Sequence, residues 1–288
     1  MQPIFVGDVQ GCADELGEIL ARAEERFGAD WELWLVGDLI NRGPANHRVL
    51  ATVRELVERG RARCVLGNHE LAFLSASLGL RPLGGSDTLG ELLDRPDRDD
   101  WVEWLRRLPL VETGALGSRR VAMVHAAAHP AWSLDELAAR ARGAADRLAR
   151  GDRDELRRFL ATAPEVDEDR DVLGRLLSCR SVSGDGRWSK HEPTEGRTAW
   201  HAAWSERGHD YGVVYGHWAM QGLHVAPGLR GLDTGCVHHG RDHDGHLTAW
   251  LPDLERADPF AVPDQGFWQV RARARYYRDP PPSAARSG

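Results

Sequence analysis

The chain has 288 residues, of which 42% are hydrophobic and 28% are charged, and its formal net charge at pH 7 is −7. A chain of this length can bury a substantial core in one large domain or in two small ones. The acidic balance argues against general DNA binding and against binding to anionic membranes through a basic face, but bound cations would still allow an anionic substrate.

The first third of the chain alternates short apolar stretches with amphipathic helical patterns. Strands are predicted at residues 4–6, 33–36 and 64–66. Helices are predicted after them, at about residues 16–27, 49–57 and 71–78. This βαβαβα order predicts parallel strands with right-handed crossovers, so the three strands should end at one edge of a sheet.

The middle of the chain is predicted to be more helical. A loop-rich stretch at 81–100 precedes a short helix at 101–108, and a strand at 120–124 leads to His125. A charged helical pattern runs from 134 to about 160, followed by an acidic, exposed stretch at 165–171. We expect residues 134–200 to form a helical insertion or lid within one domain that spans residues 1–277.

The last third carries two further strand patterns. A strand at 213–215 leads to Gly216 and His217. Strands at 231–235 and 247–250 are expected to pair as a hairpin, because Asp244-Gly245 is a hairpin-turn signal. Residues 278–288, which include three consecutive prolines, are expected to form a disordered tail.

Three motifs place polar side chains at the predicted strand ends. They are Gly7-Asp8-Val9-Gln10-Gly11, Gly37-Asp38-Leu39-Ile40-Asn41-Arg42-Gly43-Pro44 and Gly67-Asn68-His69-Glu70. Asp8 and Asp38 offer carboxylate oxygens, and Asn68 offers an amide oxygen. Gln10 lies two residues after Asp8, where a turn can direct both side chains inward.

The later strands add imidazole nitrogens from His125 and His217 to this set of oxygen ligands. Mixed oxygen and nitrogen ligands suit Mn²⁺, Fe²⁺, Co²⁺ or Zn²⁺ better than Ca²⁺. One carboxylate can bridge two ions about 3.5–4 Å apart, and such a pair can hold a hydroxide that attacks phosphorus in line. Arg42 can grip phosphate oxygens, and His69 can protonate the leaving oxygen.

Each motif alone has a plainer explanation. A Gly-Asp pair after a strand is commonly a turn, Asn-His at a helix start is commonly an N-cap, and an isolated histidine is commonly structural. Their joint occurrence in this order favours a metal site. The His-rich stretch 236–246 fixes no ligand geometry, so we expect it to be a solvated hairpin tip. Trp218 can form a wall of the site or stack on a base.

The cysteines and the amino terminus indicate a reducing compartment. The four cysteines form no Cys-X-X-Cys pair and are expected to be buried thiols. The amino terminus has no basic region followed by a long apolar one, and no stretch approaches the roughly 18 apolar residues of a membrane span. We therefore expect a cytoplasmic protein with no membrane partner.

Six segments resemble the calcineurin-like metallophosphoesterases, in the branch shared with the serine/threonine phosphoprotein phosphatases. Within that branch the chain looks like the bacterial symmetrical bis(5′-nucleosyl)-tetraphosphatases. The segments are Gly7–Cys12, Gly37–Pro44, Gly67–Leu71, Val124–Ala126, Gly216–Ala219 and Leu232–Cys236. The resemblance implies an α/β fold with a central β-sandwich, βαβαβ motifs and flanking helices.

The resemblance also implies an activity. Diadenosine tetraphosphate would be hydrolysed in the middle of its phosphate chain to two ADP. Two divalent ions would be bound, with Mn²⁺ or Co²⁺ expected and Fe or Zn as alternatives. By position, Asp8, Gln10 and Asp38 would hold the first ion. Asp38, Asn68, His125 and His217 would hold the second. His69 would be the general acid, and Arg42 would bind phosphate.

The chain departs from the family pattern at several positions. Gln10 stands where the superfamily usually has histidine, which leaves the identity and affinity of the first ion open, and Ala127 replaces a glycine. Asn41 stands where protein phosphatases have an aspartate that pairs with the catalytic histidine, which favours the nucleotide branch. Arg175 and Lys190 are candidates for binding the far phosphates, with surface ion pairs as the alternative.

Two other functions remain open from the sequence. One is a serine/threonine phosphoprotein phosphatase. The other is a dinucleotide-binding sensor in which Gln10 and Ala127 have impaired catalysis. Cleavage of nucleotide-capped RNA 5′ ends is a plausible side activity, because the same anhydride would be cut.

Overall fold

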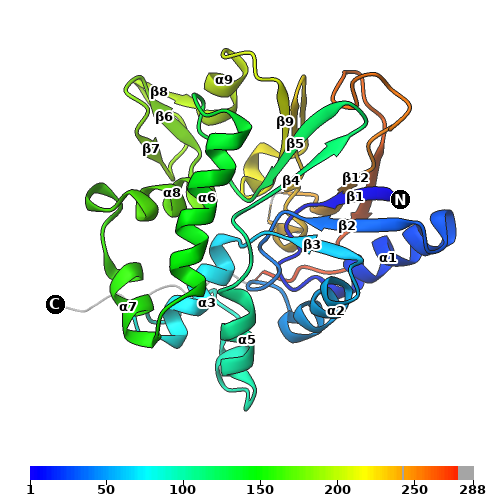
Figure 1. Cartoon of the computed structure of the whole chain (residues 1–288). Helices are drawn as coiled ribbons and strands as arrows, with labels where there is room; N and C mark the ends of the chain where they lie inside the picture. The colour runs from blue at the N-terminus through cyan, green and yellow to red at the C-terminus, as the bar shows by residue number, and fades with distance from the viewer. Residues whose placement is uncertain (242, 278–288) are drawn as a thin grey trace.

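The architecture rests on two five-stranded mixed sheets that pack face to face (Figure 1). The computed structural model describes residues 1–241 and 243–277, so the predicted disordered tail at 278–288 lies outside the described residues. In spatial order, sheet A contains β13 (Phe267–Arg271), β12 (His246–Trp250), β1 (Gln2–Val6), β2 (Trp31–Leu35) and β3 (Ala62–Cys64). Sheet B contains β10 (His224–Ala226), β11 (Leu229–Gly231), β9 (Tyr211–Tyr215), β5 (Arg119–Val124) and β4 (Val111–Leu116).

Strands buried on both faces explain the continuous apolar runs in the sequence. In β1, Ile4 and Val6 belong to the core on the helix side, whereas Phe5 belongs to the cluster between the sheets. The Phe5 ring lies 5.1 Å from that of Trp34 on β2 and 5.3 Å from that of Trp250 on β12. The same cluster includes Val121 and Met123 of sheet B. The predicted β-sandwich is therefore confirmed.

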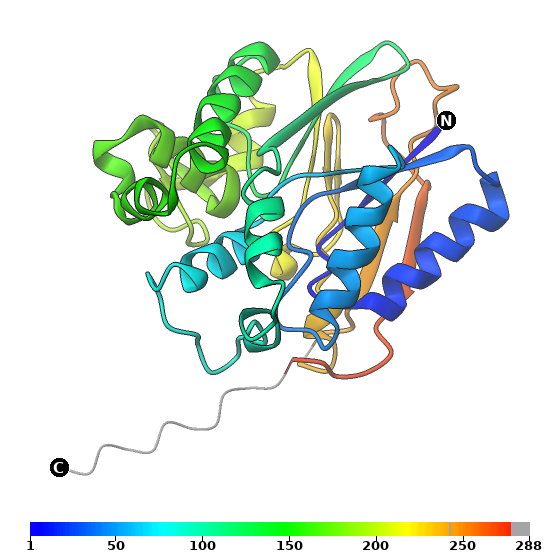
Figure 2. The ribbon, with the colours of Figure 1, turned by 60° about the horizontal axis from the view of Figure 1, so that its bottom comes forward.

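Helices cover the outer faces of both sheets (Figures 1 and 2). The helices α1 (Ala13–Phe27) and α2 (Asn46–Glu58) contact each other and cover sheet A, while α3 (Asn68–Ser77) contacts α5 (Arg98–Leu105). The helix α6 (Leu134–Ala149) packs on β4, and α9 (Trp200–Ser205) places Trp200 against Tyr215 of β9 at a ring separation of 4.9 Å. The short helix α4 (Gly90–Leu93) contacts α2.

The segment 134–200 is only partly helical. It contains α6, α7 (Arg153–Ala161) and α8 (Glu168–Ser178), with a 3-10 turn, η1 (Pro164–Val166), before α8. It also contributes a third sheet, in the order β7 (Trp188–Ser189), β6 (Ser181–Ser183) and β8 (Arg197–Ala199). The single helical pattern predicted up to residue 160 is interrupted near Gly151, which has a φ of +82°. The stretch predicted to be exposed at 165–171 spans the end of η1 and the start of α8, where Glu165, Val166 and Glu168 are exposed and the other residues are half-buried.

The structure corrects three further expectations. The stretch predicted to be a loop at 81–100 contains α4 and the start of α5, and β4 was not predicted. The hairpin expected between residues 231–235 and 247–250 is wrong, because β11 belongs to sheet B and β12 to sheet A. Gly235 turns the chain with a φ of +64°, and η3 (Cys236–His238) follows it.

Within the described ranges, 1–241 and 243–277, none of the helices combines the length and the apolar character that crossing a bilayer demands.

Gly212 in β9 offers a test of the packing between the sheets. A Cβ atom there would lie 2.3 Å from the ring of Phe260, which is fully buried and cannot move away. We expect Gly212→Ala to lower the free energy of unfolding by about 1–3 kcal/mol. The matched control is Gly17→Ala in α1, where a Cβ would meet nothing within 4 Å; it should raise that free energy by about 0.5–1 kcal/mol.

Urea unfolding of both variants measures these changes. Equal effects of the two alanines would contradict this account of the packing.

Candidate metal centre

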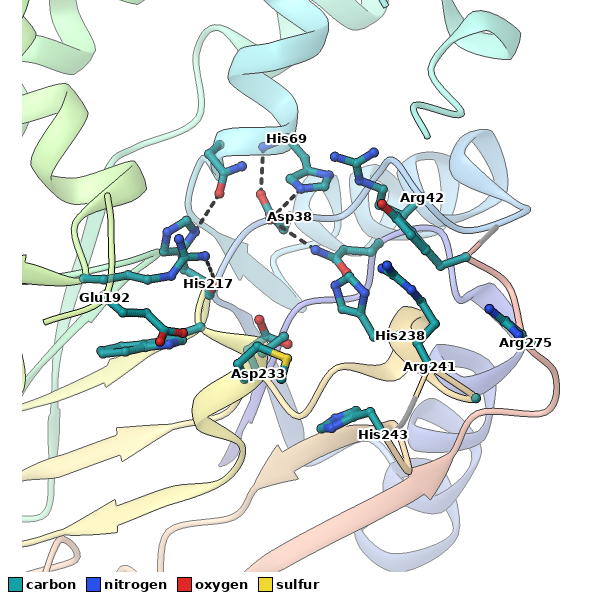
Figure 3. A pocket seen from close by; sticks show the side chains of 18 residues that line it. Asp38, Arg42, His69, Glu192, His217, Asp233, His238, Arg241, His243 and Arg275 are labelled. Atoms are coloured by element: carbon teal, nitrogen blue, oxygen red, sulfur yellow. Dashed lines mark hydrogen bonds and ion pairs between the residues drawn. The ribbon is translucent and has the colours of Figure 1, made fainter. Parts of the chain in front are cut away.

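Polar side chains follow the carboxyl ends of parallel strands in both sheets. In sheet A, Asp8 follows β1, Asp38 follows β2 and Asn68 comes after β3, at the start of α3. In sheet B, His125, His217 and Asp233 come just after β5, β9 and β11, which are also mutually parallel. Two sheets therefore deliver their strand ends to one site (Figure 3).

Direct contacts join the two sets of strand ends. The backbone N–H of His217 donates to both carboxylate oxygens of Asp8, at 3.1 and 3.2 Å. His125 Nδ1 lies 2.9 Å from the carbonyl oxygen of Val36, the residue directly after β2 of sheet A. Gly216 is the residue that allows this approach, since a Cβ there would lie 2.0 Å from Asp8 Oδ1.

The imidazoles of His125 and His217 converge on Asn68 Oδ1. His125 Nδ1 donates to the carbonyl of Val36, and Nε2 of the same ring lies 2.9 Å from Asn68 Oδ1. His217 Nε2 lies 3.2 Å from the carbonyl of Ser178, which leaves the Nδ1 lone pair 2.7 Å from the same oxygen. Acceptors that face one another at these distances fit a site for a cation.

The carboxylates near these imidazoles repel one another. Burial, followed by the charges of Asp233 and Asp38, raises the pKa of Asp8 well above its usual value. Burial raises the pKa of Asp233 to about 6. Burial also disfavours ionisation of Asp38, but the nearby His125 and His69 outweigh it and lower its pKa. A bound cation would relieve the repulsion among these carboxylates.

Each predicted ligand lies at this site. Asp8, Asp38 and His125 offer ligand atoms within 4.8 Å of one another and form a candidate metal-binding group. Gln10 lines the same cavity, and its Nε2 lies 3.4 Å from Asp38 Oδ2. Burial lowers the pKa of His217 well below its usual value, which keeps the ring neutral and able to ligate.

The backbone is strained at this site. Among the described residues, the non-glycine positions with positive φ are Gln10 (+46°), Asp38 (+50°), Asn41 (+79°), Arg42 (+67°) and His217 (+69°). Such conformations cost of order 1–3 kcal/mol each and persist only where the surroundings impose them. All five residues had been singled out from the sequence.

Glu70 holds the loop that carries Asp38. Its carboxylate is fully buried and accepts hydrogen bonds from the backbone N–H groups of Gly67, Asp38, Leu39 and Ile40 at 2.8–3.2 Å. Burial and then the charge of Asp38 raise its pKa to about 8, whereas the N–H groups favour the ionised form. The sequence places Glu70 in the third strand-end motif but assigns this residue no role.

His69, in the first turn of α3, and Arg42, in the loop after Asp38, both line the cavity. His69 Nε2 lies 3.6 Å from Asp38 Oδ2, and burial lowers the pKa of the ring. Among the described residues, His69 Nδ1 is buried without a hydrogen-bond partner. Arg42 pairs with Asp87 at 3.4 Å and hydrogen-bonds Ser86.

Asn41 uses its amide elsewhere. It donates to Asp87 Oδ1 at 2.9 Å and accepts from the N–H groups of Arg42 and Thr88, both at 2.9 Å. It therefore orients the Arg42 loop rather than contacting His69.

Arg175 and Lys190 do not line the cavity. Arg175 is buried within the insertion, in α8, where it donates to the carbonyl of Gly186 at 2.9 Å and lies over the ring of Trp132. Lys190 is exposed. Arg180, between them, lines the cavity and donates to the carbonyl oxygens of Lys190 at 2.7 Å and His217 at 3.4 Å. Arg180, rather than Arg175 or Lys190, is therefore the residue between positions 175 and 190 that reaches the cavity.

The His-rich stretch also lies at the cavity rather than at a solvated hairpin tip. His238, Arg241 and His243 line the opening together with Arg275 and Tyr277 (Figure 3). Trp218 lines it as well. The sequence did not single out Asp233 or Arg180. A strand-end position after Leu232 was the available signal for Asp233.

Replacing Glu70 by glutamine tests its role as an acceptor. The amide nitrogen would face N–H groups, so Glu70→Gln should lower the free energy of unfolding by about 1–3 kcal/mol. Glu55→Gln is the control, because Glu55 is exposed and pairs with Arg59 on the surface; its cost should stay within about 0.5 kcal/mol. Denaturant unfolding distinguishes the two. Equal stability of both variants would show that the four N–H groups do not need the carboxylate.

Comparison with known proteins places this geometry in a family. The chain is 37% identical over 259 residues to a protein of Burkholderia thailandensis named symmetrical bis(5′-nucleosyl)-tetraphosphatase, covering 83% of this chain and 87% of the relative. A protein of Janthinobacterium with the same name is 36% identical over 258 residues, with 84% and 91% covered.

Comparison with solved structures points to the same family as these relatives. A crystal structure described as a candidate diadenosine tetraphosphatase matches with a TM-score of 0.60 at 26% identity, covering 94% of this chain and 93% of the other. A serine/threonine phosphatase of Saccharomyces cerevisiae matches with a TM-score of 0.54 at 13% identity, covering 95% and 80%, and shows a shared fold alone. The family model for calcineurin-like phosphoesterases matches residues 1–275, and the protein therefore belongs to the calcineurin-like phosphoesterase family.

Proposed function

We propose that this protein hydrolyses diadenosine tetraphosphate symmetrically and releases two ADP. The observation that carries the proposal is the convergence of the Asp38, Asn68, His125 and His217 acceptors beside a cavity of about 770 Å³ lined by arginines. The names of the relatives support this substrate over a phosphoprotein.

The site fits two divalent cations, with manganese or cobalt as the proposed ions. Asp8, Gln10 and Asp38 would hold one, and Asp38, Asn68, His125 and His217 would hold the other. When bound, the cations supply activated water at neutral pH and offset the charge of the phosphate chain. The residues of the chain orient the ligands, since Glu70 fixes the Asp38 loop and Val36 fixes the His125 ring.

Arginines around the cavity suit the phosphate chain. Arg42 enters from the loop after Asp38, and Arg180 enters from the segment 134–200. Their guanidinium groups can bind phosphate oxygens bidentately. Arg180 replaces Arg175 and Lys190 in this role, and we propose that the segment 134–200 acts as a lid that presents it. Trp218 and Tyr277 provide flat rings at the cavity wall for the bases.

His69 is proposed to protonate the leaving ADP oxygen. Burial lowers the pKa of its ring, which faces the cavity, while the carboxylate of Asp38 beside it acts in the opposite direction and favours the protonated imidazole. Asn41 is proposed as a positioning residue that sets Arg42. The pKa of His69, which burial lowers, fits an easily released ADP, which needs less help from a general acid than an alcohol does.

The proposal extends to nucleotide-capped RNA 5′ ends as a secondary substrate, because the scissile anhydride is the same. It also includes a cytoplasmic location. The four cysteines are buried and unpaired, which is compatible with a reducing compartment.

The product profile tests the proposal. With Mn²⁺ and diadenosine tetraphosphate, the protein should release ADP alone, measured by anion-exchange chromatography. Asp38→Asn should lower turnover by about a hundredfold or more, because replacing a residue that merely orients a metal ligand already costs about 10–100-fold in metal affinity or activity. Release of ATP and AMP would contradict symmetric cleavage. Dinucleotide binding without products would indicate the sensor, and faster hydrolysis of phosphoserine peptides would indicate a protein phosphatase.

Arg180 and Lys190 form a matched pair for the substrate-binding assignment. Arg180→Met should raise KM roughly tenfold, because a charged hydrogen bond to phosphate contributes about 1.5–3 kcal/mol. Lys190→Met, an exposed change ten residues away, should leave KM within about twofold. Steady-state kinetics separates the outcomes. Equal KM values for the two variants would remove Arg180 from the phosphate site.

A further inference from the structure

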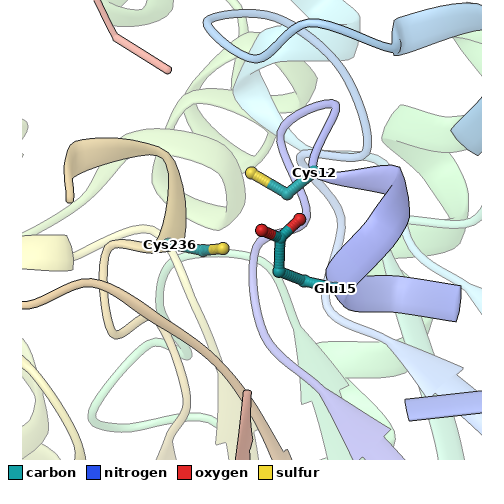
Figure 4. Close-up of side chains that lie close together, drawn as sticks. All are labelled: Cys12, Glu15 and Cys236. Atoms are coloured by element: carbon teal, nitrogen blue, oxygen red, sulfur yellow. The ribbon is translucent and has the colours of Figure 1, made fainter. Parts of the chain in front are cut away.

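A second cluster of metal-ligating side chains lies apart from the cavity, behind the loops that carry its ligands. It consists of Cys12, Glu15 and Cys236, which are all buried and offer ligand atoms within 4.8 Å of one another (Figure 4). Cys12 and Glu15 flank the start of α1, whereas Cys236 begins η3. None of these residues takes part in the function proposed above.

Glu15 is the residue that points to a ligand. Its side chain is fully buried, and Oε1 accepts from the phenol of Tyr276 and the N–H of Arg273, both at 2.8 Å. Its second oxygen, Oε2, is buried without a hydrogen-bond partner within residues 1–241 and 243–277. A buried carboxylate oxygen left unpaired is costly, and a cation beside it would offset that cost.

The two thiols complete a donor set of a different character from the catalytic one. Figure 4 shows both sulfur atoms and the carboxylate of Glu15 gathered on one spot. The two thiolates are soft ligands and favour Zn²⁺, which also accepts the harder carboxylate oxygen of Glu15, whereas the carboxylates, amides and imidazoles of the cavity also suit Mn²⁺ or Co²⁺. In a tetrahedral zinc site with Zn–S bonds of about 2.3 Å, the two sulfurs lie about 3.8 Å apart, within the span of this cluster.

We propose that Cys12, Glu15 and Cys236 supply three of the four ligands of one structural zinc ion. Binding replaces the two thiol protons, which pass to solvent, and leaves the oxidation state of every atom unchanged. The hydroxyl of Tyr276, already bonded to Glu15, lies behind the carboxylate and orients it.

The position of the cluster gives the ion a structural consequence. Cys12 is two residues after Gln10, and Cys236 is three residues after Asp233. Glu15 also holds the segment of Arg273 and Tyr276, which is followed by Tyr277 at the cavity. The ion would therefore tie together three segments that reach the catalytic cavity from different parts of the chain.

Hydrogen bonding to Cys236, followed by burial, raises the pKa of the Cys12 thiol well above its usual value. Without a cation the Cys12 thiol therefore stays protonated, and zinc has to displace its proton. The inference stands on the geometry of the three side chains and the unpaired Glu15 oxygen.

Cobalt substitution of the full-length protein tests the site. Apo-protein titrated with Co²⁺ should develop a near-ultraviolet thiolate-to-cobalt absorption, which the catalytic ligands cannot produce because they include no sulfur. Cys12→Ser and Cys236→Ser should abolish it. Cys64→Ser and Cys179→Ser are the matched controls, since both thiols are buried and lie outside the cluster; they should retain it. Asp38→Asn should also retain it while losing turnover.

X-ray absorption at the zinc edge supplies a measurement that needs no cysteine variant. Asp38→Asn loaded with about one equivalent of Zn²⁺ should show two sulfur ligands at about 2.3 Å. Zinc bound through nitrogen and oxygen alone would overturn the proposal. The proposal would also be overturned if the wild type showed no thiolate-to-cobalt band or if the band persisted in both serine variants. A disulfide between Cys12 and Cys236 in the purified protein would overturn it as well. None of these results bears on symmetric cleavage, which the product profile decides separately.

Discussion

The structure depends on one constraint, which is that acceptor groups from two sheets are forced together at the edge where their parallel strands end. Asn68 Oδ1 lies 2.9 Å from Nε2 of His125 and 2.7 Å from Nδ1 of His217. Asp8 and Asp38 lie beside them, buried. Such a cluster is unfavourable without positive charge and favourable with it, so the fold supplies the protein part of a cation site and cations supply the remainder.

The surrounding structure restrains this unfavourable arrangement. Five non-glycine residues adopt positive φ at the site, and Glu70 ties the Asp38 loop to the start of α3 through four N–H groups. Close contacts between backbone and side chains leave no room for relaxation, as at Gly216 and at Gly67, where a Cβ would lie 2.2 Å from the backbone nitrogen of Asp38. Packing between the two sheets therefore determines the positions of the side chains at the site.

The sequence predicted what is encoded locally. Strand-end motifs identify Asp8, Asp38 and Asn68, because a short apolar run followed by glycine and a polar residue is visible in a few positions. The sequence did not predict which basic side chain of the insertion reaches the cavity. That depends on how the chain turns from α8 into β6, which leaves Arg175 buried in the core and Arg180 facing the cavity. The false hairpin has the same origin. Adjacent strand patterns do not say that β11 and β12 belong to different sheets. The proximity of Cys12 and Cys236 could not be predicted either, because these residues are 224 positions apart in the sequence (236 − 12).

Crystals grown with Mn²⁺ offer the most direct test of the central claim. Anomalous difference maps should show two peaks at the strand ends, one in reach of Asp8, Gln10 and Asp38 and one in reach of Asp38, Asn68, His125 and His217. Maps with no peak among these side chains, in a structure that otherwise reproduces the fold, would contradict the account.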